Sequence, residues 1–550
     1  MGGSVVMDEF DYIIIGAGSS GCVLADRLSA DGRTTVLLLE EGSDNHTELI
    51  NMPRAFMTMW GNPKYFWHFP VKPQEGRPPN EAVFYGRGLG GSSSTNGTWY
   101  MRGEPADYDA WHAQGLNEWS WAEVERCYRE IESYHADDAY AQRGRNGPLQ
   151  IRKLPFRSRF LSAVIKAAEQ MGIPYLGDIN TPGRQGIGYT QASVDRKGRR
   201  ASAYRMFLKP AMARANLKVL TGALVECIEI ADRRVSGVRY RRDGAVQHAS
   251  ARHDVIVSAG VLQSPKLLQL SGVGPADVLA QAGVPVVLDA PQVGRNMADH
   301  VTFSMSFRMK GYKGFNREFG GWRVLRHTLQ YYAFRSGLMA YTCPEITAMI
   351  AMGVPDHWPN VQIGIGPFSM RSSEEMKADP GRGALESEPG YTLNGYYLRP
   401  KTRGSVAIQS ADIAQPVLVD ANWWGDPDDR RALIDMTRLM RRYAAQPALH
   451  DYTVREVSPG AAVETDEDIA HALEWLVGSG LHATGTCRMG PSPDAVLDSR
   501  LRVRGIAGLR VVDCSAMPTV PSGNTNAPAM MLGYRAAELI IEDRLAAAQV

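Results

Sequence analysis

A glycine-rich turn lies between two short apolar runs near the start of the chain. Residues 11–15 (Asp-Tyr-Ile-Ile-Ile) lead into the turn 16–21 (Gly-Ala-Gly-Ser-Ser-Gly), and a second apolar run, 36–39, ends on an acid. The residues after the turn have apolar side chains at helical spacing. Strand, turn, helix, strand and acid, in this order, are the pattern of a dinucleotide-binding βαβ unit. We therefore predict a Rossmann-like domain that starts here.

Each part of this unit has a physical reason. Gly16 permits the tight turn, Gly18 lets backbone N–H groups approach a pyrophosphate at the helix N-terminus, and Gly21 lets the helix pack closely on the sheet. Glu40 lies 19 residues beyond Gly21, where a carboxylate can accept the hydroxyls of an adenosine ribose. A lone GxGxxG motif is weak evidence, but here its flanking segments agree with it. The predicted cofactor-binding residues of the unit are Gly16, Gly18, Ser19, Ser20, Gly21 and Glu40.

Length and charge restrict the possible functions. A chain of 550 residues is too long for one simple core, so we expect two or more domains, which can be interleaved in sequence. The 60 Lys and Arg residues balance 59 Asp and Glu residues. This balance gives no electrostatic reason to expect nucleic acid or an anionic membrane as a partner. A small neutral substrate fits better.

Cysteine usage and hydropathy indicate the compartment. The six cysteines are scattered, without CxxC pairs or nearby histidine clusters, so we expect neither a metal site nor a disulfide framework. No run approaches the ~18 apolar residues of a membrane span, and the first residues do not resemble a signal peptide. We expect a cytoplasmic protein without a transmembrane segment; peripheral attachment to a membrane stays open.

A second glycine-rich stretch, residues 86–98, reads Gly-Arg-Gly-Leu-Gly-Gly-Ser-Ser-Ser-Thr-Asn-Gly-Thr. Its glycines allow the backbone to approach a flat ligand, and its small polar side chains can surround that ligand with donors. A flexible surface linker is the alternative. The stretch is flanked by aromatic residues and lacks the length and charge of a linker, so we favour a ligand-binding loop.

With these two motifs the sequence resembles the glucose-methanol-choline (GMC) family of FAD-dependent oxidoreductases. The likeness covers nearly the whole chain, because further family motifs follow in the same order at residues 258–268, 293–300, 481–490 and 523–528. It implies an α/β fold in which an FAD-binding Rossmann-like domain is interleaved with an α+β substrate domain built on an antiparallel sheet. We place the FAD-binding domain at 8–150, 190–300 and 475–550 and the substrate-binding domain at 151–189 and 301–474.

The resemblance also implies which residues contact FAD. In the second glycine-rich stretch these are Leu89, Gly91, Ser92, Asn96, Gly97 and Thr98. Val225 would face the adenine through its backbone, and Asp513 would lie near the phosphates. The family usually has Ala or Gly at the position of Cys514, which we interpret as a small-residue replacement rather than a redox centre. Members that bind FAD covalently through histidine carry it at the position of Thr95, so we predict non-covalent FAD.

His482 and Asn524 align with the two polar active-site residues of the family. Small residues follow His482, so its imidazole can face a cavity, whereas we expect other histidines, such as His300, to be structural hydrogen bonders. A neutral imidazole can accept the hydroxyl proton of an alcohol as general base. Asn524 would donate to the substrate oxygen while the hydride passes to flavin N5. Asn526 would cap the last helix, whose N-terminus would face the anionic edge of reduced flavin.

The predicted function is therefore FAD-dependent oxidation of a primary alcohol to an aldehyde, by a dehydrogenase or oxidase acting on CH–OH donors. The partners are a small-molecule alcohol and an electron acceptor, which is oxygen, a quinone or another carrier. The alternatives on the same fold are a hydroxynitrile lyase, a fatty-acid photodecarboxylase, a choline-type dehydrogenase and a flavin-carrying binding protein. Cys343 slightly favours the photodecarboxylase, but residues 361–366 lack an arginine to pair a carboxylate.

Glu345, a further predicted substrate-site residue, bears on substrate charge. In choline-type members a glutamate from this region faces a quaternary ammonium group, which is normally also surrounded by aromatic faces. The sequence around Glu345 offers only Tyr341 nearby, and an unpaired buried carboxylate is costly. We therefore expect Glu345 to pair with an arginine or to accept backbone hydrogen bonds. Neutral primary alcohols, aliphatic or aryl, should then be better substrates than choline.

Overall fold

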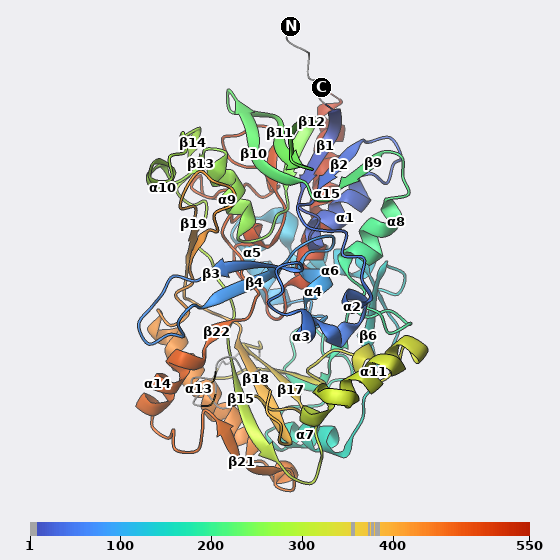
Figure 1. Cartoon of the computed structure of the whole chain (residues 1–550), viewed down its shortest axis with the longest axis vertical. Coiled ribbons are helices and arrows are strands. Elements are labelled where there is room, and N and C mark those ends of the chain that lie inside the picture. The colour runs from blue at the N-terminus through green and yellow to red at the C-terminus, as the bar shows by residue number, and fades with distance from the viewer. Residues whose placement is uncertain (1–7, 354–357, 372–374, 376–378, 380–384, 550) are drawn as a thin grey trace.

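Two large β-sheets organise the molecule, one in the upper and one in the lower half of Figure 1. The computed structural model describes residues 8–353, 358–371, 375, 379 and 385–549. None of the helices in this described part combines the length and apolar character that a membrane-spanning segment requires.

The first sheet collects strands from three distant parts of the chain. Its order is β10 (Leu224–Ala231), β11 (Arg234–Arg242), β12 (Ala245–Val257), β1 (Asp8–Ile15), β2 (Val36–Leu39) and β9 (Leu217–Leu220), with β23 (Leu509–Val511) also paired to β12. β1 runs parallel to both β12 and β2. Ile13 and Ile14 of β1 are completely buried, as expected of a parallel strand covered on both faces.

Two helices pack together against this sheet. They are α1 (Ser19–Leu28), which follows the first glycine turn, and α15 (Asn526–Ala547) at the other end of the chain. A Cβ added at Gly533 of α15 would lie 2.8 Å from the carbonyl oxygen of Ser20 in α1. The two helices therefore approach each other at a position that has room only for glycine.

The second sheet is antiparallel. Its order is β21 (Thr453–Ser458), β15 (Val301–Met309), β18 (Gly390–Tyr397), β17 (Val361–Gly366), β16 (Ile346–Ile350) and β7 (Gly186–Tyr189), with β22 (Gly478–Ser479) paired to β15. The alternating apolar residues of β15, Phe303, Met305 and Phe307, are all buried. Helices α7 (Arg159–Gln170) and α13 (Pro427–Ala444) share the apolar core of this sheet. Strand β19 (Ser405–Ala407) pairs with β20 (Leu418–Asp420) in a separate small sheet.

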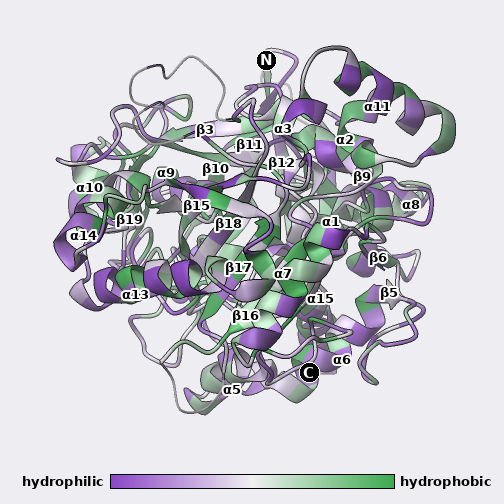
Figure 2. Ribbon diagram, turned by 90° about the horizontal axis from the view of Figure 1, so that it is seen from below, coloured by the Kyte–Doolittle hydropathy of each residue, from purple (hydrophilic) through white to green (hydrophobic). Residues whose placement is uncertain are grey.

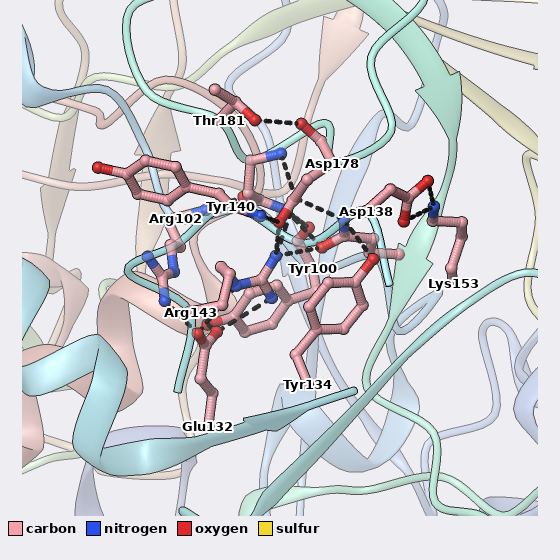
Figure 3. A network of polar contacts seen from close by, with 12 residues as sticks. Tyr100, Arg102, Glu132, Tyr134, Asp138, Tyr140, Arg143, Lys153, Asp178 and Thr181 are labelled. Atoms are coloured by element: carbon pink, nitrogen blue, oxygen red, sulfur yellow. Dashed lines mark hydrogen bonds and ion pairs between the residues drawn. The ribbon is translucent and has the colours of Figure 1, made fainter. Parts of the chain in front are cut away.

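A third sheet joins β5 (Glu132–Tyr134), β6 (Leu149–Lys153) and β8 (Gln191–Ala192), and a buried ion network lies beside it (Figure 3). Arg143 lies between two carboxylates, with Nε 2.9 Å from Glu132 and Nη1 2.9 Å from Asp178. Arg102 also pairs with Glu132. Burial alone would raise the pKa of Glu132, but the two arginines hold it below its usual range. Because Arg102 follows the second glycine-rich stretch, this network fixes the chain that leaves that stretch.

The remaining elements lie around these sheets. The longer helices are α5 (Pro105–Ala113), α6 (Trp121–Ile131), α9 (Gln263–Leu270), α10 (Ala276–Gln281), α11 (Gly321–Phe334) and α14 (Asp466–Leu476). Shorter ones are α2 (Glu48–Asn51), α3 (Phe56–Met59), α4 (Ser92–Thr95) and α8 (Lys209–Ala211). The remaining strand pairs are β3 (Phe66–Pro70) with β4 (Ala82–Gly86) and β13 (Val273–Gly274) with β14 (Leu288–Asp289).

Candidate active site

A cavity of about 430 Å³ is lined by residues that follow strands β1, β2 and β12 of the first sheet and by residues of β17 and β18 of the second sheet. The predicted site residues that line it are Gly16, Gly18, Ser19, Ser20, Glu40, Gly91, Ser92, Asn96, Gly97, His482, Asp513, Cys514, Asn524 and Asn526. Predicted site residues that do not line it are Gly21, Leu89, Thr98, Val225 and Glu345. The fold thus brings both glycine-rich stretches and the predicted catalytic pair to one space.

The two glycine-rich stretches meet at one end of the cavity. Gly16 has a φ of +100°, and a Cβ on it would lie 2.5 Å from the carbonyl oxygen of Ser258. Gly91 has a φ of +49°, and a Cβ on it would lie 2.9 Å from the Cα of Gly18. Side chains at these positions would therefore clash with backbone. The bare backbone that remains leaves room for a dinucleotide next to the start of α1, which fits the phosphates of FAD.

Glu40 is buried at the end of β2 and lines the same cavity. Its carboxylate accepts backbone N–H bonds from Ala17 (2.9 Å), Gly42 (2.8 Å) and Gly88 (3.0 Å). Burial raises the pKa of Glu40, and these three bonds oppose that rise. Because a carboxylate offers about four acceptor sites, one remains for a ribose hydroxyl.

Four of the predicted cofactor-binding residues lie behind the cavity wall. A Cβ on Gly21 would lie 2.0 Å from the carbonyl oxygen of Gly16, so Gly21 allows α1 to pack as predicted. Leu89 is part of the apolar core under the first sheet. Val225 is buried on β10, two residues after Ala223, whose N–H donates to the Glu40 backbone oxygen. Thr98 is buried, and its hydroxyl has no hydrogen-bond partner among the described residues.

The chain segment at Asp513 and Cys514 lines the cavity near Ser258. Asp513 accepts hydrogen bonds from the Ser264 hydroxyl (2.5 Å), the Ser515 N–H (2.8 Å) and the Gly260 N–H (3.0 Å). Burial raises the pKa of the Cys514 thiol to about 12. A thiol that stays protonated is a poor nucleophile, which agrees with a small-residue replacement.

The last helix begins at the cavity, but its cap differs from the prediction. Thr525 is the N-cap of α15, and Asn526 is the first helical residue, so the predicted cap at Asn526 was wrong by one position. The Asn526 side chain instead accepts a hydrogen bond of 2.8 Å from the Ser19 hydroxyl. Asn526 thus links the start of α15 to the start of α1, and the positive ends of both helix dipoles are near the cavity.

His482 and Asn524 are hydrogen-bonded to each other. Asn524 Oδ1 accepts a bond of 3.1 Å from Gln362 Nε2, which leaves Asn524 Nδ2 to donate to His482 Nε2 at 2.9 Å. The free lone pair of His482 is therefore at Nε2. A substrate hydroxyl that enters between these two atoms can donate to Nε2 and accept from the amide.

A second histidine completes this arrangement. His300 Nδ1 lies 3.0 Å from His482 Nδ1, and the two rings are nearly perpendicular at 82°. Asp299 accepts the backbone N–H of His482 at 2.9 Å and also bonds the Ser479 hydroxyl. Residues 299 and 300 end the motif at 293–300, so this motif holds both the ring and the backbone of His482.

Burial keeps the imidazole of His482 neutral. It lowers the pKa of His482 to about 3, because a charged ring would lose its hydration in the cavity wall. Burial also lowers the pKa of His300 well below its usual value, and His482 and Arg399 add to this. A neutral base is the state that accepts a hydroxyl proton.

Among the described residues, eight aromatic side chains contribute to the cavity wall. The aromatic lining residues are Phe56, Trp60, Trp67, Phe69, Tyr85, Trp99, Phe368 and Tyr396. Tyr396 stacks on His482 with ring centroids 5.5 Å apart. These aromatics come from distant parts of the chain, so the sequence next to Glu345 did not indicate them.

Glu345 lies behind the cavity wall and is paired, as predicted, with an arginine. Arg54 Nη2 is 2.6 Å from Glu345 Oε1, and both side chains are 2% exposed. A Cβ on Gly366, which lines the cavity, would lie 3.0 Å from Glu345 Oε2. Burial raises the pKa of Glu345, and Arg54 opposes that rise. The carboxylate next to the cavity therefore already has a positive partner.

Sequence reasoning missed several residues that hold the site. Arg200 is completely buried and donates from Nη1 to the carbonyl and side-chain oxygens of Asn96 (2.6 and 2.8 Å), which fixes the second glycine-rich stretch. Arg54, His300 and Gln362 were not assigned to the site either. Only His300 had a sequence signal, its place in a family motif. Within the described residues, no group of three or more His, Cys, Asp and Glu side chains could hold a metal ion.

Known proteins resemble this chain over almost its whole length. The family description GMC oxidoreductase matches residues 10–302 with its N-terminal part and residues 400–533 with its C-terminal part. An oxygen-dependent choline dehydrogenase of Photobacterium profundum is 38% identical, over 97% of this chain and 93% of that protein. An alcohol dehydrogenase [acceptor] of Pseudomonas putida is 34% identical, over 97% and 96% of the two chains.

Solved structures share the architecture. Pyridoxine 4-oxidase from Mesorbium loti superposes with a TM-score of 0.85 at 28% identity, over 96% of this chain and 98% of that chain. Formate oxidase of Aspergillus oryzae superposes with a TM-score of 0.89 over 98% and 99% of the two chains. At 24% identity this second likeness concerns the fold alone.

Proposed function

The chain belongs to the GMC oxidoreductase family, an FAD-dependent family of enzymes that act on CH–OH donors, and on that premise we propose that it oxidises a primary alcohol to an aldehyde with His482 as general base. One observation carries the proposal: a single cavity is lined by the nucleotide-binding turn and by the bonded pair His482 and Asn524. Bound FAD would supply the acceptor for the hydride that leaves the α-carbon.

Residues of the chain would bind the alcohol and accept its proton. The alcohol hydroxyl enters between His482 Nε2 and the Asn524 amide and transfers its proton to Nε2. Asn524 donates to the substrate oxygen as negative charge develops there, since Gln362 holds the amide in this orientation. His300 keeps the proton of neutral His482 on Nδ1, away from the substrate. The aromatic walls exclude water from the polar atoms that react.

The cofactor contacts are part of the same proposal. Backbone N–H groups at the start of α1 would bind the phosphates, and Glu40 would bind the ribose. The second glycine-rich stretch would bind the flavin. Thr95 lies buried in α4 and offers no ring nitrogen for a covalent bond, so FAD is held without one.

For the substrate we propose a neutral primary alcohol. The supporting observation is the buried pair of Arg54 and Glu345, because a carboxylate that already has a cationic partner gives little additional attraction to a cationic substrate. The aromatic side chains in the wall suit an aliphatic or aryl chain.

Choline oxidation is the second candidate, and two observations favour it. Aromatic faces, which bind quaternary ammonium groups, line the cavity, and a choline dehydrogenase is 38% identical. A hydroxynitrile lyase and a photodecarboxylase have less support. Burial raises the pKa of Cys343, which lines the cavity, to about 11, and the described strand β17 has no arginine for a carboxylate.

We also propose the division into domains. Segments 8–150, 190–300 and 475–550 would form the FAD-binding domain, and 151–189 and 301–474 the substrate-binding domain. Strand membership supports this division, since every strand of the first sheet lies in the segments of the FAD-binding domain. Every strand of the second sheet except β22 lies in the segments of the substrate-binding domain.

The electron acceptor and the compartment are proposals too. Oxygen, a quinone or another carrier would reoxidise the enzyme, and the reducing cytoplasm is the compartment that the scattered cysteines suit.

An alcohol panel tests the proposal. The holoenzyme is mixed anaerobically and in the dark with aliphatic alcohols, aryl alcohols and choline, and bleaching of the flavin absorbance is followed. We expect neutral primary alcohols to bleach the flavin, with higher kcat/KM than choline when an artificial dye is the acceptor. Choline as the best substrate would support the second candidate. No bleaching by any alcohol would contradict both.

A further inference from the structure

Helix α11 (Gly321–Phe334) turns its apolar side chains outwards. Only Tyr331 of its fourteen residues is buried. The exposed apolar residues are Trp322 (65%), Leu325 (59%), Leu329 (60%), Tyr332 (46%) and Phe334 (76%). The first four recur at intervals of three, four and three residues, so they share one face of the helix, named here the α11 face. A surface helix normally directs such a stripe towards the core.

The opposite side of α11 is firmly attached to the molecule. Tyr331 belongs to a small apolar cluster with Met52, Ala55, Met339 and Ala340. Its hydroxyl donates to the Asn51 carbonyl oxygen at 3.1 Å. The helix is therefore docked on the body, and the α11 face points away from it. Figure 2 shows α11 at the rim of the molecule.

Basic residues surround the α11 face. Residues 308–335 contain seven Arg and Lys residues and one acid, Glu318. The turn that carries Arg196 and Lys197, both exposed, packs against the end of α11, because a Cβ on Gly198 would lie 2.6 Å from the Arg335 carbonyl oxygen. The balanced charge of the whole chain thus conceals a local positive surface.

Some of this charge is neutralised. Glu318 lies 3.1 Å from Arg326 and 3.8 Å from Arg323, and Glu48 lies 2.8 Å from Arg335. Two further arginines of residues 308–335 are paired as well, Arg308 with Glu386 at 2.6 Å and Arg317 with Glu388 at 3.7 Å. Exposed Arg196 and Lys197 form no ion pair among the described residues, and Glu318 faces two arginines, so a net positive charge remains around the apolar stripe.

We propose that the α11 face is a docking surface for an anionic lipid bilayer. The apolar stripe would enter the boundary between headgroups and acyl chains, and the basic residues would contact the headgroups. Trp322 and Tyr332 have the ring types that are enriched at this boundary, with an apolar body and a polar tip.

A second copy of the chain is the less suitable occupant. A helix of fourteen residues is about 21 Å long, and with a width of about 10 Å its face offers about 200 Å². Stable protein dimers bury about 800 Å² on each partner. In a two-fold dimer the same positive surface would also meet itself, which is unfavourable.

The chain just before α11 lies close to the cavity wall. Phe319, just before α11, lies with its ring centroid 6.3 Å from that of Phe368, which lines the cavity. If the proposed function is correct, docking would bring the substrate pocket close to a bilayer that holds lipophilic alcohols or quinones. Membrane binding itself does not depend on the reaction, so the two proposals can fail separately.

Vesicle flotation tests the docking surface. The holoenzyme is mixed with phosphatidylcholine vesicles that contain or lack phosphatidylglycerol, at low and high salt. We expect binding to the anionic vesicles that weakens as salt is added, because salt screens the headgroup charge. Absence of binding to anionic vesicles at low salt would overturn the proposal.

Two sets of variants make the test specific. Trp322→Ser/Leu325→Ser/Leu329→Ser should weaken binding at least about 30-fold, since burial of each side chain contributes severalfold. Arg196→Gln/Lys197→Gln should weaken it by roughly fivefold for each residue. Val454→Ser/Leu545→Ser, which removes two apolar residues that are 55% exposed elsewhere, is the matched control and should bind like the wild type.

Further measurements test whether the variants are folded and whether a second copy of the chain covers the α11 face. Flavin content and activity on a water-soluble alcohol should be unchanged in all three variants, which shows that they are folded. Equal vesicle binding by the serine triple variant and the wild type would overturn the proposal. So would light scattering that finds a dimeric wild type and a monomeric triple variant, since a second copy would then cover the face.

Discussion

His300 Nδ1 lies 3.0 Å from Nδ1 of His482, and only one proton can occupy the space between them. The Asn524 amide donates to His482 Nε2, so the proton of the neutral His482 ring is on Nδ1 and is donated to His300. The site therefore selects the tautomer of His482 from both sides of the ring.

His300→Ala should consequently lower the rate of flavin reduction by roughly 10- to 100-fold, the scale of one or two lost hydrogen bonds. KM should change less, because His300 is not among the cavity-lining residues. His300→Asn can place an acceptor near the position of Nδ1 and should recover much of the rate. Equal rates in the two variants would indicate that His300 only fills space.

With His482 as the proposed base, flavin reduction should persist at low pH. Burial lowers the pKa of His482 to about 3, so the neutral form that accepts a proton is populated throughout pH 5.5–8. Burial raises the pKa of neighbouring Asp299 to about 7, so this carboxyl would itself titrate within the window. The rate of flavin reduction is therefore measured in Asp299→Asn, which removes that titration. We expect a flat profile. A fall towards acid pH with a midpoint near 6.5 would show that His482 titrates as an exposed histidine.

The flavin should be released when the protein unfolds. Thr95 cannot form the bond that histidine forms at this position in covalent members, so acid precipitation should leave FAD in the supernatant. A covalent flavoprotein processed in parallel keeps its colour in the pellet and is the control. Yellow colour in the pellet of this protein would contradict non-covalent binding.

The pair of Arg54 and Glu345 should contribute to stability more than to catalysis. Arg54→Met leaves a buried carboxylate without its partner and should lower the free energy of unfolding by about 3–5 kcal/mol. Arg54→Met/Glu345→Gln should recover most of this loss. Glu345→Gln alone should change kcat/KM for neutral alcohols by less than about tenfold. Additive losses in the double variant, measured by denaturant unfolding, would argue against the pair.

Local pattern was sufficient for some elements of the fold. Strand β2 has the predicted bounds, and its four apolar residues are buried, as is typical of a central parallel strand. The cap of α15 was missed by one residue, because Thr525 and Asn526 can both cap a helix and only the contact with Ser19 shows what Asn526 does.

The site was predicted less completely, because its contacts join distant parts of the chain. His482 and Asn524 were found through motifs of the family. The partners that orient them, His300 and Gln362, lie 182 and 162 positions away, and Arg54 lies 291 positions from Glu345. No periodicity in a sequence reports such pairs. The aromatic residues of the cavity wall were missed for the same reason.

Stopped-flow reduction of the flavin by a saturating neutral primary alcohol is the most direct test of His482 as the base. His482→Ala should lose at least ~100-fold in rate and keep its FAD, whereas Asn524→Ala should lose roughly 10- to 1000-fold, as for one donor to a developing oxyanion. A reduction rate in His482→Ala equal to that of the wild type, at full flavin content, would place the base elsewhere and contradict this account.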